Sequence, residues 1–455
     1  MSGTTLRERR GGNADPVAVS FSELFFDLAL VSSTARLSEY VRHGEEVHFD
    51  LRFVSCLFSF WYIWHSTNLQ YNFTSAASTS PFRNITLFIK LAAVLTMSSS
   101  VKESPTLSDD IRFMRSYVVA RMVDACVYAR LHRLARRDGF ASSVCNGLVA
   151  NGVSNILESI IWAACSATVT STEGMVKAMF GAQVFSYVGL RTITQKIWRQ
   201  TSGEEEEGGG KKVSFDFKHF RERQGLLIIL VLGEAIMSSV LTEEEVNDGT
   251  TLFQQYAVSF SCALIAFLLK ILYIDSPLID EWQEVVSALV PPSSLLRSRP
   301  PSPSELLGFV AFAPLHAVVL ALTTCTAAAF KLVLDSGEAD AGGKGLLMAS
   351  LGGSIMAVGM CKSVKYDVPA LDKFEEASGV DLRIVAELAT GCLLVVLGQL
   401  ADDFRRVSCI VCALGLLLSL VLFEYGYCRW TIGRLERLKE VKEMGALDES
   451  LLTKA

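Results

Sequence analysis

The sequence predicts an all-α, polytopic membrane protein of about twelve transmembrane helices, compatible with two six-helix halves. Half of the 455 residues are hydrophobic and the mean hydropathy is +0.35, values too apolar for a soluble protein of this length. A helix crosses the hydrocarbon core of a bilayer with about 20 apolar residues, and twelve segments approach that length. The predicted spans are residues 17–38, 51–70, 84–101, 113–131, 147–170, 174–195, 221–241, 252–274, 305–334, 345–361, 382–400 and 407–428.

Basic residues support these spans and orient them. Lys and Arg accumulate in the loops on the cytoplasmic side of a membrane. If the N-terminus lies inside, the loops assigned to the inside hold most of the 42 basic residues, whereas the outside loop at 242–250 holds none. An even number of spans then places both termini in the cytoplasm. We expect an integral protein of the plasma membrane or of an organelle membrane.

Loop composition divides the chain further. The longest basic-flanked loop contains the acidic and glycine-rich run EEEEGGGKK at 204–212 and separates six predicted spans from six, as a linker would. The predicted segments are a cytoplasmic N-terminal tail at 1–16, a first six-helix half at 17–198, an acidic, glycine-rich linker at 199–220, a second six-helix half at 221–430 and a cytoplasmic C-terminal tail at 431–455.

Several function classes receive no support from the sequence. The net charge of −6 gives no reason to expect a nucleic-acid partner. Nucleotide-binding, zinc-protease and serine-hydrolase motifs are missing, so we expect neither an enzyme nor a cofactor. Glycines spaced along two late spans favour close helix packing instead; they are Gly352, Gly353 and Gly359, and Gly391 and Gly398.

Acidic residues inside predicted spans are the strongest functional signal. In SFSELFFDLALV, residues 20–31, Glu23 and Asp27 lie one helical turn apart and so share a face. Ser20 and Glu23 fit a capping box, which would hold Glu23 at the water interface. Asp27 lies about 10 Å beyond that cap, where a charge costs roughly 2.5 to 3.5 kcal/mol. Glu234 is a second deep acid, about twelve residues past Glu222.

Two interpretations of these acids stay open, a permeation site or a structural ion pair. The basic residues considered as partners are Arg36, Lys90, Arg115, Arg121 and Arg191. Arg121 and Asp124 are three residues apart and can pair on their own helix, or Arg121 could bind a ligand or gate a path. His65 and His316 are further candidates, although single histidines in helices are more often packed and hydrogen-bonded than functional.

Two stretches together resemble a known family. SELFFDLALV at 22–31 is similar to the first-helix signature of the bacterial low temperature requirement A (LtrA) family, and ERQGLLIILVLGEAI at 222–236 is similar to its second signature. The resemblance covers about 17–430 and implies a polytopic membrane protein linked to growth in the cold. It implies signature positions at Glu23, Asp27, Glu222 and Glu234. Gln224 and Ala29 depart from the usual pattern but leave these acids intact.

Our leading hypothesis is a channel or secondary transporter for an ion or small solute that uses Asp27 and Glu234 as buried acids near its path. The alternative is a non-transporting sensor or scaffold in stress (cold) adaptation, in which the acids are purely structural. The expected partners are the lipid bilayer and a monovalent cation or a proton, with a homodimer as the candidate assembly.

Overall fold

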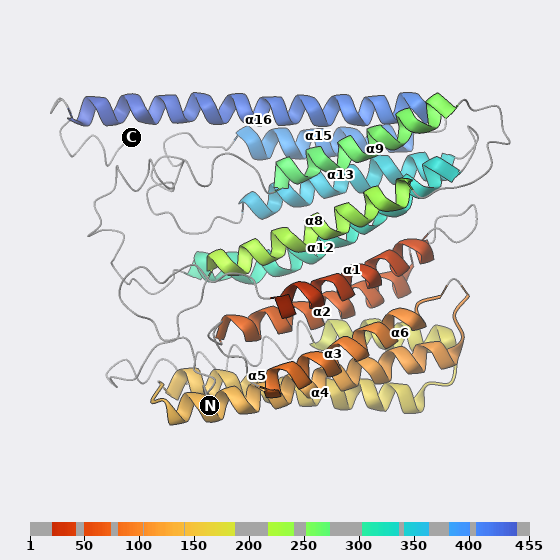
Figure 1. The fold of residues 1–455 in the computed structure, drawn as a ribbon, viewed down its shortest axis with the longest axis vertical. Coiled ribbons are helices and arrows are strands. Elements are labelled where there is room, and N and C mark those ends of the chain that lie inside the picture. Colours follow the sequence, from red (N-terminus) through yellow and green to blue (C-terminus); the bar gives the residue numbers. More distant parts are fainter. Residues whose placement is uncertain are drawn as a thin grey trace. The chain divides into compact units, whose positions relative to one another are not determined.

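The computed structural model describes residues 21–41, 50–73, 81–102, 104–140, 142–186, 217–240, 252–273, 303–335, 341–363, 382–400 and 406–443. The regular elements of these residues are helices, drawn in Figure 1. The chain divides into two compact units, Met1–Val231 and Leu232–Ala455. The division falls within α8 (Phe217–Val240), so the start of α8 belongs to the first unit. The prediction of six-helix halves beginning at 17 and 221 stays a prediction.

Eleven other helices lie in the part of the chain that the structure describes. The first unit contains α1 (Phe21–Val41), α2 (Leu51–Phe73), α3 (Pro81–Ser100), α4 (Leu107–Arg137), α5 (Ser142–Thr168) and α6 (Thr172–Val184). The second unit contains α9 (Leu252–Tyr273), α12 (Pro303–Asp335), α13 (Ala341–Ser363), α15 (Leu382–Gln399) and α16 (Arg406–Glu443). Each predicted span overlaps one of these twelve helices, which confirms the all-helical class within the described residues.

Within the described residues, five helices are long and apolar enough to cross a membrane, judged by length and composition. Their apolar stretches are Val144–Thr168, Tyr256–Tyr273, Leu315–Val333, Gly342–Cys361 and Val407–Tyr427. They are candidate membrane spans and indicate an integral membrane protein, whereas twelve crossings stay a prediction. The stretch in α16 ends well before the helix does. At 1.5 Å per residue, the 38 residues of α16 extend about 57 Å, almost twice the hydrocarbon thickness of about 30 Å.

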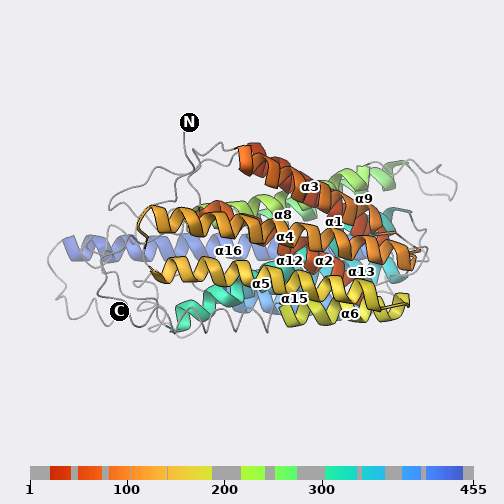
Figure 2. The ribbon, with the colours of Figure 1, turned by 90° about the horizontal axis from the view of Figure 1, so that it is seen from below.

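Within the first unit, α4 and α5 lie side by side (Figures 1 and 2). Thr106 caps α4 in a capping box with Asp109, which satisfies backbone N–H groups that a helix start leaves without partners. Gly139 follows the helix with φ of 76°, a conformation that favours glycine. The short connection to α5 then makes the two helices antiparallel neighbours.

One face of α4 is buried and carries charge. Tyr117, Arg121, Asp124 and Tyr128 are all buried, and their spacing of four, three and four residues places them on one stripe of the helix. α3 and α5 pack against α4, and α2 packs against α4 and α6. Charged and polar side chains of α4 therefore lie inside the first unit.

In the second unit, α13 packs against α15 through glycines. A Cβ atom added to Gly352 would lie 2.5 Å from the backbone oxygen of Gly391, and one added to Gly398 would lie 3.2 Å from that of Gly345. The helix backbones therefore approach each other more closely than any side chain allows. This confirms the close packing predicted from the glycine spacing.

Candidate functional site

Asp27 is held by two donors inside the first unit. The carboxylate is fully buried, and its Oδ1 accepts hydrogen bonds from Trp64 Nε1 at 2.7 Å and from Arg223 Nη2 at 2.6 Å. Arg223 lies on the first part of α8 and is itself only 1% exposed. The buried negative charge of Asp27 on α1 is therefore paired with the buried guanidinium of Arg223.

Glu23 belongs to the same group of charges. Its Oε2 lies 3.3 Å from Arg223 Nη1, and its Oε1 accepts a hydrogen bond from Arg83 Nη2 at 3.2 Å. The Tyr71 ring lies beneath both guanidinium groups, 4.5 Å from Arg83 and 5.7 Å from Arg223, within cation–π range. Glu23, Asp27, Arg83 and Arg223, which we call the α1 charge cluster, carry two charges of each sign.

Arg121, considered from sequence as a partner for Asp27, bonds Asp124 and Glu158 instead, and Arg223 bonds Asp27. Arg223 was not among the bases considered. A signal was available, because Arg223 lies inside the second LtrA-like stretch, directly after Glu222. The side chain of Glu222 and all of Ser20 lie outside what the structure describes, so the predicted capping box of Glu23 is left as a prediction.

A second charged group crosses from α3 through α4 to α5. Lys90 pairs with Asp124 Oδ1. Arg121 Nη1 donates to Asp124 Oδ2 at 2.7 Å, and Arg121 Nε and Nη2 donate to Glu158 Oε2 at 2.9 and 2.8 Å. The predicted pairing of Arg121 with Asp124 is confirmed. Lys90, Asp124, Arg121 and Glu158 form what we call the α4 charge chain, which is also balanced in sign.

Neutral groups complete this chain. The Tyr117 hydroxyl donates to Glu158 Oε1 at 2.5 Å, and the Tyr62 ring lies 4.3 Å from the Arg121 guanidinium. Gln70 Nε2 donates to Asp124 Oδ1 at 2.9 Å, while Lys90 donates to the Gln70 carbonyl oxygen at 2.7 Å. Buried charges that are both paired and hydrogen-bonded avoid much of the cost of leaving water.

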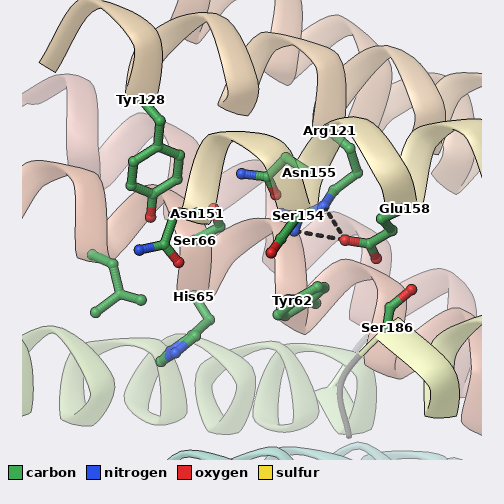
Figure 3. A pocket seen from close by; sticks show the side chains of 11 residues that line it. Tyr62, His65, Ser66, Arg121, Tyr128, Asn151, Ser154, Asn155, Glu158 and Ser186 are labelled. Carbon is green, nitrogen blue, oxygen red and sulfur yellow. Dashed lines mark hydrogen bonds and ion pairs between the residues drawn. The ribbon is translucent and has the colours of Figure 1, made fainter. Parts of the chain in front are cut away.

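A polar cavity of about 30 Å³ lies beside the α4 charge chain (Figure 3). Its volume suits one or two water molecules. The Arg121 and Glu158 side chains form part of its wall, with the ion pair between them drawn as dashed lines in Figure 3. The remaining lining residues are Tyr62, His65, Ser66, Leu69, Tyr128, Asn151, Ser154, Asn155 and Ser186.

The predicted site residues belong to both units. His65 reaches the cavity of the first unit and stacks on Trp61, with ring centroids 4.9 Å apart. His316 belongs to the second unit, where its ring nitrogens lie 2.6 and 2.8 Å from the Tyr273 hydroxyl. Glu234 is also in the second unit and is partly buried. Searched over the described residues, no group of three or more His, Cys, Asp and Glu is placed to hold a metal ion.

Glu158, the acid at the α5 end of the α4 charge chain, was not among the site residues predicted from sequence. Glu158 lies on α5, 37 residues from Arg121, and α5 otherwise has the composition of an ordinary apolar span. Its position four residues after Ser154 and three after Asn155 was the available signal, because these positions share one polar face of the helix.

The model of the bacterial low temperature requirement A protein (LtrA) family matches residues 18–423. The match spans most of the chain and includes both charged groups, so the protein belongs to the LtrA family. Comparisons with curated proteins and with solved structures found no significant match.

Proposed function

We propose that this LtrA-family membrane protein is a channel or secondary transporter that conducts protons or small monovalent cations through its first unit. The observation that carries the proposal is the α4 charge chain, which ends at a polar, water-sized cavity. Ionisable groups inside membrane helices are rare and typically mark ion paths and proton relays. Here four of them follow one another within hydrogen-bonding distance.

The size of the cavity favours the smallest cargo. A cavity of about 30 Å³ has room for one or two water molecules. A proton, or a cation that has shed most of its water, fits such a space, whereas a sugar or an amino acid would require a different conformation. We therefore place protons and monovalent cations ahead of larger solutes.

The α1 charge cluster has a different role in this proposal. Asp27 and Glu23 do not line the cavity, and Arg223 lies against both of them. We propose that this cluster is structural and holds the start of α8 against α1 through ion pairs. This differs from our hypothesis from sequence, which put Asp27 beside the permeation path.

A non-transporting sensor or scaffold is the second candidate. The specific observation in its favour is that both charged groups are balanced in sign, as purely structural ion pairs would be. Under this alternative, removing both partners of a pair would change stability alone.

Flux measurements in proteoliposomes separate the two candidates. Wild-type protein would be tested with pH gradients and with a series of monovalent cations, beside two charge-neutral double variants. Arg121→Gln with Glu158→Gln removes a pair on the cavity wall, and Asp27→Asn with Arg223→Gln removes a pair away from it. We expect flux in wild type, loss of flux in the first variant and retained flux in the second, each checked for monodispersity. Absence of any wild-type flux would contradict the proposal and favour the scaffold.

A further inference from the structure

We propose that Glu158 is the proton-binding carboxylate of the first unit and that the adjacent cavity gives water access to it. The inference rests on the proposed function for its role in transport, whereas proton binding itself can be measured without transport. Glu158 and Asp124 are the two acids of the α4 charge chain, and Glu158 is the one that lines the cavity. Figure 3 shows its carboxylate beside Arg121 at the cavity wall.

The bonding of Glu158 leaves room for a proton. Oε2 of Glu158 accepts both hydrogen bonds from Arg121, and Oε1 accepts one hydrogen bond from the Tyr117 hydroxyl. Each carboxylate oxygen has two lone pairs, so Oε1 keeps one that can take up H⁺. The product is a neutral carboxylic acid, and the unit gains one positive charge.

Arg121 keeps an anionic partner after this step. Its Nη1 already donates to Asp124 at 2.7 Å, so neutral Glu158 does not leave the guanidinium without a counter-charge. Asp124 is the less suitable proton acceptor, because it bridges two cations, Arg121 and Lys90. Protonating Asp124 would leave Lys90 buried without its carboxylate, a costly state inside a membrane protein.

The cavity supplies the polar partners that ordered water needs. Ser186 is 1% exposed, lines the cavity, and its hydroxyl has no hydrogen-bond partner within the described part of the protein. Asn155 is also buried on this wall. A buried water usually makes two to four hydrogen bonds, which these side chains and Glu158 can provide. Proton transfer through such a water is within ordinary acid–base chemistry.

Other titratable groups face Glu158. α4 contributes Arg121, Tyr117 and Tyr128, α2 contributes Tyr62 and His65, and Asp124 and Lys90 lie behind Arg121. Ser186, which follows α6 in the chain, also lies on the cavity wall and does not titrate. His65 is the competing proton site. Its cation would share the cavity wall with the permanently charged Arg121, whereas a proton on Glu158 removes a negative charge next to a second acid, Asp124.

Infrared difference spectroscopy on the purified full-length protein tests the inference. Spectra recorded across pH steps detect the carbonyl stretch of each newly protonated carboxylic acid, and exchange into D₂O shifts that band. Subtracting the spectra of Glu158→Gln from those of wild type isolates the contribution of this residue. We expect a protonation band that is lost in Glu158→Gln and kept in His65→Gln.

A second variant guards against misfolding. If Glu158→Gln is not monodisperse, Glu158→Asp keeps a carboxyl group one methylene shorter, and we expect its protonation band to change in frequency. A band that persists in well-folded Glu158→Gln, or that disappears with Asp124→Asn instead, would overturn the inference. A wild-type band without any ion flux would support proton binding at Glu158 and count against the proposed transport function, so the two failures are distinguishable.

Discussion

Replacing Gly352 by alanine should destabilise the second unit, and the structure sets the size of the effect. The new Cβ would lie 2.5 Å from the Gly391 backbone oxygen and 3.0 Å from Leu394 Cβ. Contact at about 3.5 Å is normal between such atoms, so α13 and α15 would have to separate by about 1 Å. Overpacking of this kind costs about 1–3 kcal/mol. The higher helix propensity of alanine offsets at most about 1 kcal/mol of it.

Gly415 provides the matched control. It lies in α16, and a Cβ atom built there meets nothing within 4 Å, so Gly415→Ala gains helix propensity without a clash. Thermal unfolding in detergent can be measured as the fraction of protein that stays monodisperse at each temperature. The midpoint should be lower for Gly352→Ala and equal to or higher than that of wild type for Gly415→Ala. Gly391→Ala should behave like Gly352→Ala, because its Cβ would lie 2.6 Å from the Gly352 oxygen. Equal midpoints for Gly352→Ala and Gly415→Ala would refute the reasoning.

Three further predictions concern the first unit. Asp27→Asn should cost up to about 3–5 kcal/mol, because Arg223 then lies beside a neutral amide and keeps Glu23, 3.3 Å from its Nη1, as its anionic partner. Adding Arg223→Gln should restore part of the loss, and strict additivity in the double-mutant cycle would contradict the pairing of Asp27 with Arg223. Hydrogen bonds from Lys102 and Thr106 hold the pKa of Asp109 well below its usual range. The stability that Asp109 contributes should therefore be constant above about pH 4 and fall at lower pH, where the unfolded chain takes up a proton that the folded protein still excludes. Unfolding midpoints measured from pH 7 downward should depend on pH less in Asp109→Asn. Thr106→Ala should cost about 0.5–2 kcal/mol by removing the cap of α4, and an unchanged unfolding midpoint would argue against that cap.

The helices could be predicted from sequence because hydropathy is a local property. Every apolar run of suitable length corresponds to a helix among the described residues. The pairing of Arg121 with Asp124 was equally accessible, because residues three apart on a helix must be neighbours. The close approach of α13 and α15 at Gly352 and Gly391 could also be predicted, because small residues are spaced along both helices.

Partners distant in sequence could not be predicted in the same way. Arg223 is 196 residues from Asp27, and Glu158 is 37 from Arg121. To identify which basic residue pairs with a buried acid, one must know how the helices pack. A single sequence contains no local signal for that packing. The cavity is harder still to predict from sequence, since side chains of α2, α4, α5 and the residues that follow α6 define it together.

The bond between Asp27 and Arg223 also sets an order of events during biosynthesis. Ribosomes add about 5–20 residues per second, so the 196 residues that separate the two take roughly 10–40 s to make. During that interval α1 is already available for insertion, and the guanidinium that bonds Asp27 does not yet exist. Trp64 is made earlier and can donate its hydrogen bond to the carboxylate. The final seating of α1 must therefore follow the synthesis of α8, and the two LtrA-like stretches complete each other late in the assembly of the bundle.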